Sequence, residues 1–256
     1  MARYQVILKY DGTEYFGFQR QAEGRDQRTV QWAVETALRN IGWQGVSILA
    51  AGRTDTGVHA KGQVIAFDLE WKHSLQDLLA AINANLPSDV AVSCLKIVPD
   101  NFHPRFDALS RTYQYRVICQ STRDPLRERY IWRIHHELDL EILQQSARSL
   151  VGVHDFSAFG APPRPGGTTI RQVFQSGWLK RQDEFIFEIQ ANAFLYHMVR
   201  RLVGFQVAVG QGRYGLQDLA SRLTGGYHDL VKELAPPQGL SLIAVEYPEN
   251  VALRTT

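Results

Sequence analysis

The residues best suited to chemistry lie in one short stretch, residues 52–60, which reads Gly-Arg-Thr-Asp-Thr-Gly-Val-His-Ala. Its two glycines permit positive backbone angles and close backbone approach, and loops held on a sheet are common places for catalytic groups. Asp55 follows Arg53 by two residues, and a guanidinium close to a carboxylate favours the charged form that can act as a nucleophile. The same spacing also fits a simple turn closed by an Asx-type hydrogen bond from Asp55.

Two other classes of site can be tested on these residues. Asp55-Thr56-Gly57 is the triplet of aspartic proteases, but those enzymes need two carboxylates that share a proton. The chain has no second Asp-Thr-Gly or Asp-Ser-Gly, so we exclude that class. His59, His103 and His197 stand in separate motifs without close paired spacing, which predicts no bound metal.

The segments around this loop predict a split-βαβ unit. Residues 4–10 alternate apolar and polar side chains, as a half-buried strand does. Thr29 is suited to cap a helix that stops at Gly42, and Ser74 with Asp77 is suited to start a second helix. The predicted order is strand, helix, two strands, helix and strand, over residues 4–10, 29–41, 46–51, 63–68, 74–82 and 90–98. This βαββαβ order is that of ferredoxin-like folds.

The second half of the chain predicts a similar order of elements. Strands are expected at 112–118, 170–179, 184–191 and 241–247, and helices at 139–150, 195–203 and 216–223. We therefore predict an α+β protein with two domains: residues 1–105, which carry the loop with Asp55, and residues 106–256.

Composition limits the class of protein. Hydrophobic residues make up 45% and charged residues 21% of the 256 residues, which is typical of a soluble globular chain. We expect no membrane span, because the apolar stretches are short, and no signal peptide, because a strand pattern begins at the N-terminus. The two cysteines, Cys94 and Cys119, suggest no disulfide framework and favour the cytoplasm.

The charge distribution points towards nucleic acid more than the net charge of +2 does. Between His103 and Arg133, seven arginines stand against three acids. The arginine fork binds phosphate with two hydrogen bonds, so this segment is a candidate RNA-binding surface. The same count also fits a solvated, arginine-rich face.

Motifs along nearly the whole chain resemble those of tRNA pseudouridine synthase I, the TruA family. The loop with Asp55 is one of them, and six further segments follow in the order expected of that family: 10–13 (Tyr-Asp-Gly-Thr) with 17–19 (Gly-Phe-Gln), 83–87 (Asn-Ala-Asn-Leu-Pro), 102–106 (Phe-His-Pro-Arg-Phe), 111–115 (Arg-Thr-Tyr-Gln-Tyr), 192–200 (Asn-Ala-Phe-Leu-Tyr-His-Met-Val-Arg) and 236–240 (Pro-Pro-Gln-Gly-Leu). The resemblance implies two ferredoxin-like halves that form one extended, mostly antiparallel sheet with helices packed on one side. It also implies that residues 106–256 complete the active-site cleft and form the dimer interface.

The same resemblance implies the activity. It indicates an isomerase that converts uridine to pseudouridine at positions 38 to 40, in the anticodon arm of tRNA, as a cytoplasmic homodimer. Asp55 matches the catalytic aspartate, Arg53 and Arg200 match the basic residues around it, and Tyr113 matches the tyrosine that stacks on the target base. Possible RNA contacts are His59, Lys61, His103, Arg105, Arg111 and His197. We expect no cofactor, because the reaction is an isomerisation and no ligand cluster is visible.

The reaction accounts for these residue types. Pseudouridylation breaks the N1–C1′ bond, turns the uracil, joins C5 to C1′ and releases the C5 proton. Attack of Asp55 on C1′, its attack on C6, and removal of a ribose proton are three roles between which the sequence does not choose. Flipping the base out of its stack costs a few kcal/mol, and an aromatic ring such as that of Tyr113 returns about 1–3 kcal/mol by stacking.

Two alternatives stay open at this point. Tyr113 also fits a strand tyrosine in the core. A non-catalytic RNA-binding module on a ferredoxin-like sheet is the other function that the sequence allows.

Overall fold

A computed structural model describes residues 1–20, 28–162, 166–225 and 229–249. Two compact units divide the chain: unit 1 is Met1–Leu109 with Leu242–Thr256, and unit 2 is Ser110–Ser241. The roles that the sequence assigns to the domains 1–105 and 106–256 stay predictions.

The sheet of unit 1 is built around a central strand, β1. Its strands are β1 (Ala2–Tyr10), β2 (Leu49–Ala50), β3 (His59–Leu69), β4 (Val90–Val98) and β10 (Leu240–Glu246). β1 pairs antiparallel with β3 on one side and with β4 on the other, while β2 and β10 lie beside β3. The alternate residues Tyr4, Val6, Leu8 and Tyr10 are all buried, as the alternating pattern predicts.

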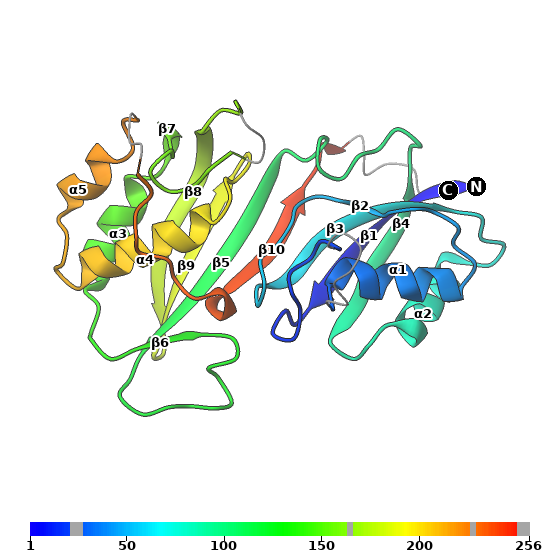
Figure 1. The fold of residues 1–256 in the computed structure, drawn as a ribbon, viewed down its shortest axis with the longest axis horizontal. Coiled ribbons are helices and arrows are strands. Elements are labelled where there is room, and N and C mark those ends of the chain that lie inside the picture. The colour runs from blue at the N-terminus through cyan, green and yellow to red at the C-terminus, as the bar shows by residue number, and fades with distance from the viewer. Residues whose placement is uncertain (21–27, 163–165, 226–228, 250–256) are drawn as a thin grey trace. The chain divides into compact units, whose positions relative to one another are not determined.

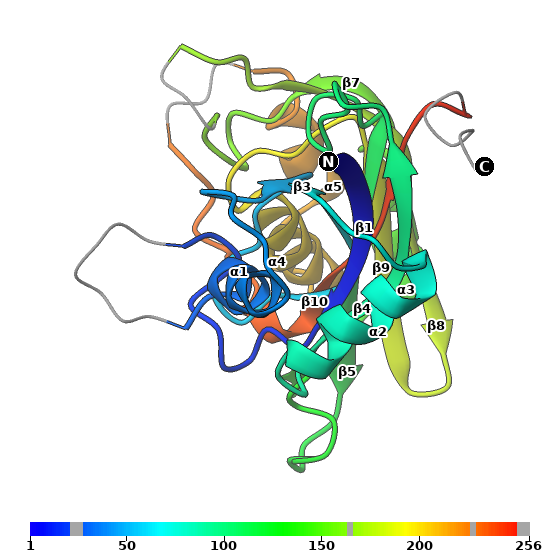
Figure 2. The ribbon, with the colours of Figure 1, turned by 90° about the vertical axis from the view of Figure 1, so that its right-hand side faces the viewer.

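Two helices of unit 1 begin at the caps expected from the sequence. α1 (Val30–Asn40) starts after Thr29, whose side-chain oxygen accepts from the Trp32 N–H. α2 (Leu75–Asn85) starts with a capping box between Ser74 and Asp77. Figures 1 and 2 show α1 and α2 side by side. The βαββαβ order predicted for the first half of the chain is therefore confirmed.

In unit 2, four strands lie in the order β5, β9, β8 and β7, each antiparallel to its neighbour. Their bounds are β5 (Ser110–Cys119), β7 (Gly152–Asp155), β8 (Ile170–Arg181) and β9 (Glu184–Ala191), and β6 (Trp132–Ile134) pairs parallel with β5. The helices are α3 (Leu140–Arg148), α4 (Met198–Gly210), α5 (Leu216–Ser221) and the short 3₁₀ turn η1 (Pro237–Gly239).

A buried polar network joins two of these helices to β8. The amide oxygen of Gln206 on α4 accepts from the Ser146 hydroxyl at 3.0 Å and from the Trp178 indole N–H at 2.9 Å. Both Gln206 and Ser146 are fully buried, so these polar groups are satisfied inside the core. The network fixes α3, α4 and β8 against one another.

The α+β class and the mostly antiparallel pairing are confirmed, with three local differences. The predicted strand 46–51 shrinks to two residues, because Val46 is exposed and the Ile48 N–H is bound by the Glu35 side chain instead of a strand. β6 and β7 were not predicted, because three or four residues are too few to show a period. The helix predicted from residue 195 begins at Met198, since His197 has a left-handed φ of 61°.

Candidate active site

The loop that carries Asp55 links β2 to β3 and is fixed on both sides of the aspartate. Thr54 is buried, and its side-chain oxygen lies 2.8 Å from the Tyr10 hydroxyl. The Thr54 carbonyl accepts a hydrogen bond from the Phe18 N–H at 3.0 Å, and the Val58 N–H donates to the Asp55 carbonyl at 3.1 Å. The backbone of Asp55 is therefore held from both directions, while its side chain is half-buried.

Residues 11–18 pack directly against this loop. A Cβ atom at Gly12 would lie 2.0 Å from the Val58 carbonyl oxygen, and one at Gly17 would lie 2.9 Å from the Thr54 carbonyl oxygen. Gly17 also has a φ of +86°, which side chains rarely adopt. Glycine is required at both positions for the two loops to touch. Two motifs that are far apart in the sequence thus form one support.

His59 belongs to the same support. Its Nδ1 atom lies 3.0 Å from the Gly12 nitrogen and 3.2 Å from a carboxylate oxygen of Asp11. The Gly12 N–H can only donate, so Nδ1 accepts in this contact. The His59 side chain is 6% exposed, which makes it a structural part of the loop, and its expected RNA contact stays a prediction.

Two exposed basic side chains flank Asp55 in the sequence. Arg53 lies two residues before it on the loop, and Lys61 lies near the start of β3. Two exposed cations so close to Asp55 in the sequence suit the approach of a polyanion.

His103 and Arg105 lie in a turn that hydrogen bonds hold internally. The Asp107 N–H donates to the His103 carbonyl at 3.0 Å, and the Arg105 N–H donates to His103 Nδ1 at 3.1 Å. The imidazole packs against Phe106, with ring centroids 4.3 Å apart. Burial lowers the pKa of His103, against the opposing effect of the Asp107 carboxylate. Arg105 and Phe106 are exposed on this turn, so they are accessible to a ligand.

The two tyrosines of the β5 motif, Tyr113 and Tyr115, have different surroundings in unit 2. Tyr113 is half-buried, and its ring meets Phe194 edge to face, with centroids 5.0 Å apart and an interplanar angle of 85°. Tyr115 is fully buried and donates to the Pro236 carbonyl at 2.6 Å. Burial raises the pKa of Tyr115 well above its ordinary value. Tyr115 is therefore a core residue, and Tyr113 is the one of the pair with an accessible ring.

Arg200, near the start of α4, is fixed by the segment that precedes η1. Its Nε donates to the Ala235 carbonyl at 2.8 Å, and the Ala235 N–H donates back to the Arg200 carbonyl at 3.1 Å.

His197 stacks on Tyr196, with centroids 3.7 Å apart. An Arg111 guanidinium nitrogen donates to the Asn192 carbonyl at 2.9 Å, which ties the start of this motif to β5.

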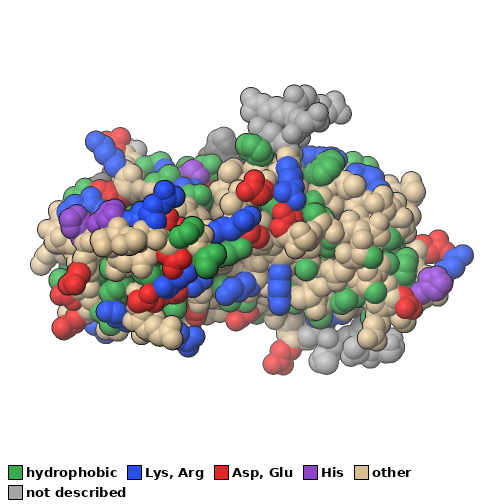
Figure 3. Space-filling model, turned by 90° about the horizontal axis from the view of Figure 1, so that it is seen from below, with side chains coloured by type: hydrophobic (Ala, Val, Ile, Leu, Met, Phe, Trp, Pro, Cys, Tyr) green, Lys and Arg blue, Asp and Glu red, His purple; other side chains and the backbone are tan. Residues whose placement is uncertain are grey.

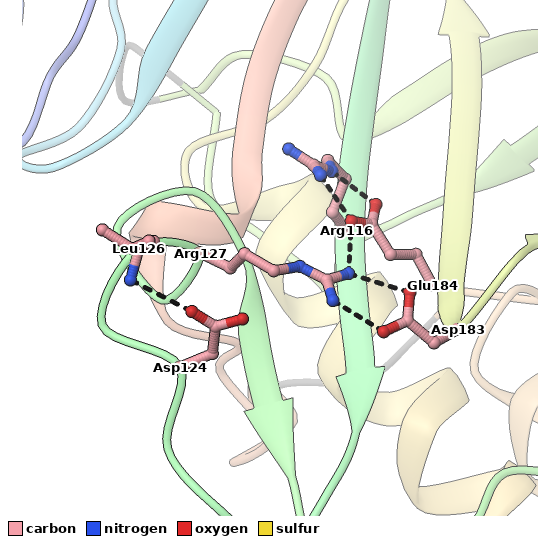
Figure 4. A network of polar contacts seen from close by, with 6 residues as sticks. All are labelled: Arg116, Asp124, Leu126, Arg127, Asp183 and Glu184. Carbon is pink, nitrogen blue, oxygen red and sulfur yellow. Dashed lines mark hydrogen bonds and ion pairs between the residues drawn. The ribbon is translucent and has the colours of Figure 1, made fainter.

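Most arginines of the 105–133 segment already contact carboxylates. Arg127 binds both Asp183 and Glu184, and Arg116 binds Glu184, with N–O distances of 2.6–2.9 Å (Figure 4). Arg123 and Arg133 pair with Glu128. On the face shown in Figure 3, basic and acidic side chains are interspersed. The excess of arginine in this segment is therefore partly neutralised by acids from another strand pair, which the local count of charges could not show.

The structure thus places the expected site residues in two sets, one in each unit. Unit 1 holds Arg53, Asp55, His59, Lys61, His103 and Arg105, and unit 2 holds Arg111, Tyr113, His197 and Arg200. Three residues that support the site received no role from the sequence: Tyr10, Gln63 and Phe194. Gln63 carried no distinct signal, because β3 also contains the polar residues Lys61 and Asp68.

Neither a metal cluster nor a membrane helix is found in the part of the chain that the structure describes. No three His, Cys, Asp or Glu side chains there gather as a possible metal site. No helix among the same residues is both long and apolar enough to span a bilayer.

Comparison with known proteins assigns the family. The family model for tRNA pseudouridine synthase matches residues 6–107 and 146–248. A tRNA pseudouridine synthase A of Paraburkholderia phymatum is 40% identical over 99% of this chain and 94% of its own length. One of Legionella pneumophila is 37% identical over 98% of this chain and 95% of its own length.

Among solved structures, a Cbf5–Nop10–Gar1 complex aligns with 79% of this chain and 54% of that chain, at 10% identity and a TM-score of 0.32. A likeness at that level supports no conclusion, so the assignment rests on the family model and on the sequence identities. These matches cover nearly the full length of the chain and show that it belongs to the tRNA pseudouridine synthase family, a family of isomerases.

Proposed function

We propose that this protein isomerises uridine to pseudouridine at positions 38 to 40 in the anticodon arm of tRNA, with Asp55 as the catalytic nucleophile. The observation that carries the proposal is the identity of up to 40% with tRNA pseudouridine synthases across nearly the whole chain. The geometry of the Asp55 loop supports it, because a half-buried carboxylate on a fixed backbone is suited to covalent chemistry.

Each remaining site residue has a role in this proposal. Arg53 and Arg200 balance the negative charge of the carboxylate and of the flipped nucleotide. Tyr113 stacks on the target base, and Phe194 supports its ring from the side by an edge-to-face contact. Arg105, Arg111, Lys61 and the histidines His59, His103 and His197 are the proposed RNA contacts.

The overall reaction is an isomerisation, which changes no net oxidation state and leaves no added group on the product. Asp55 bonds to the substrate and is released again before the product leaves. The N1–C1′ bond breaks, the uracil turns and C5 bonds to C1′. The proton on C5 leaves to a base and N1 gains a proton, so the product has the same atoms as the substrate. We therefore propose that no cofactor takes part, and that the enzyme acts as a cytoplasmic homodimer, as the resemblance to its family implies.

The test is incubation of the purified protein with unmodified tRNA transcript, followed by mapping of pseudouridine along the tRNA. Asp55→Asn is the matched variant, because asparagine keeps the shape and lacks the charge. It should bind tRNA and form no pseudouridine in single-turnover reactions with enzyme in excess. Asn-variant turnover close to that of the parent would show that Asp55 is structural.

The same experiment separates the alternative of a non-catalytic RNA-binding module. Such a module would bind the transcript tightly and leave every uridine unchanged, in the parent as well as in the variant. Pseudouridine outside the anticodon arm would instead support the reaction and contradict the proposed positions.

A further inference from the structure

We propose that Tyr10 and Gln63 are positioning residues that set the direction of the Asp55 carboxylate by holding the backbone and side chains on its N-terminal side. The inference rests on the proposed function, because it assigns a role within that site. Neither residue is itself expected to touch the substrate, since both are buried beneath the loop.

The first contact in this arrangement is between Tyr10 and Thr54. The Tyr10 hydroxyl lies 2.8 Å from Thr54 Oγ1, and both residues are buried. Burial raises the pKa of Tyr10 to about 12, with hydrogen bonds to Thr54 and Gln63 acting against that rise. The hydroxyl therefore keeps its proton at neutral pH and serves as a fixed hydrogen-bonding group under the residue next to Asp55.

Gln63 holds the other end of the same backbone stretch. Its Nε2 donates to the Gly52 carbonyl at 3.0 Å, and its Oε1 accepts from the Val64 N–H at 3.2 Å. The Gln63 side chain is fully buried. Gln63 thus holds the carbonyl of Gly52, three residues before Asp55, while Tyr10 holds Thr54.

The sheet itself brings these two side chains together. In the β1–β3 pairing, Leu8 lies opposite Gln63 but Tyr10 lies opposite Ala60, so β3 has one extra residue between these pairs. Such a bulge increases the local twist and changes the direction of side chains, and bulges are frequent next to active sites. This irregularity sits directly below the loop.

Small errors in the position of a reacting group slow the reaction strongly. A misplacement of about 1 Å lowers rates by about a hundredfold even when binding is intact. Thr54 is held through its side chain by Tyr10 and through its carbonyl by the Phe18 N–H, so loss of the first contact lets the residue rotate about the second. The expected defect is therefore in the chemical step and not in the affinity for tRNA.

The test compares Tyr10→Phe with Tyr4→Phe. Both tyrosines are buried on β1, but Tyr4 stacks on Phe67 near the other end of the strand. Single-turnover rates, tRNA dissociation constants and thermal midpoints are measured for both. Tyr10→Phe should slow pseudouridine formation by about tenfold to a hundredfold with unchanged tRNA affinity, while Tyr4→Phe should match the parent.

A second set of variants separates positioning from a general loss of structure. Thr54→Val removes the hydroxyl partner and should reproduce the Tyr10→Phe defect, whereas Thr54→Ser keeps the hydroxyl and should restore most of the rate. The double variant Tyr10→Phe with Thr54→Val should be no slower than the slower single variant, because both remove one contact. Full additivity of the two defects, or a parental rate in Tyr10→Phe, would overturn the inference.

These outcomes also distinguish the two levels of the proposal. A parent protein that forms no pseudouridine would overturn the proposed function and this inference with it. An active parent whose Tyr10→Phe variant is equally active would overturn the inference alone.

Discussion

Replacing Glu35 by glutamine should destabilise unit 1 by about 2–3 kcal/mol. The Glu35 side chain on α1 is fully buried, and its Oε1 accepts from the Gln31 amide at 2.7 Å and from the Ile48 N–H at 3.2 Å. Its Oε2 lies 3.1 Å from an Arg20 guanidinium nitrogen and 3.6 Å from one of Arg39. The second oxygen makes charge contacts and no aligned hydrogen bond.

The magnitude follows from these contacts. An amide in place of the carboxylate puts an NH₂ group against other donors whichever way it turns, and one unsatisfied buried donor costs about 1–3 kcal/mol. Loss of the charge also removes the attraction to the two arginines. Their side chains are 42% and 43% exposed, so water resolvates them and the total stays below the roughly 3–5 kcal/mol of a fully buried broken pair.

Urea unfolding followed by tryptophan fluorescence is the assay, since Trp32 lies on α1 and Trp43 shortly after it. Glu70→Gln is the control, because Glu70 is exposed at the end of β3 and should change stability by less than about 0.5 kcal/mol. Equal midpoints for Glu35→Gln and the parent would contradict this prediction, and would show that desolvation of the carboxylate cancels its contacts.

Three further predictions concern the substrate and pH. Tyr113→Phe should keep tRNA affinity while Tyr113→Ala weakens it, and an Ala variant with full activity in single-turnover assays would place base stacking elsewhere. Changing the exposed Arg105 and Arg129 to Gln should make the negative slope of log K for tRNA association against log salt shallower by about one per phosphate contact. Arg127 is bound to Asp183 in Figure 4, so Arg127→Gln should leave that slope unchanged. Contact with Arg116 and then Arg127 lowers the pKa of Glu184 below its ordinary 4.5. A carboxylate whose pKa is lower in the folded than in the unfolded state stabilises the fold at pH values above the unfolded-state pKa, and this stabilisation is lost as the pH falls through the folded-state pKa. The stability of Glu184→Gln should therefore depend less on pH below about 4.5 than the stability of the parent does; the same pH dependence in both proteins would contradict this.

Much of unit 1 could be predicted from the sequence because its signals are local. The alternation of β1, the Thr29 cap and the Ser74–Asp77 capping box each act within a few residues, and all three appear in the structure. The short strands β6 and β7 could not be predicted, because they are defined by pairing with β5 and β8 and not by a pattern of their own.

The charges of the 105–133 segment show a second limit. The local count gives an excess of arginine, but the carboxylates that bind Arg116 and Arg127 come from residues 183 and 184, at the turn between β8 and β9. A turn that is distant in sequence thus alters the net charge that the segment presents at the surface. The count of charges within the segment therefore overstates the capacity of arginines already paired with carboxylates to bind phosphate.

The candidate site depends both on a local sequence pattern and on contacts between residues that are distant in the sequence. Asp55 could be singled out from the sequence because its loop is one of several ordered motifs that resemble the tRNA pseudouridine synthase family, whereas the loop alone also fits an Asx turn. Its support was not visible, because Tyr10 and Thr54 are 44 positions apart and meet only when β1 and β3 pair. Gly12 and Gly17 have to be glycines because the backbone of the Asp55 loop lies too close to them for a side chain. A residue pattern can therefore point to a candidate group such as Asp55, while the contacts that surround this group form only when the sheet folds.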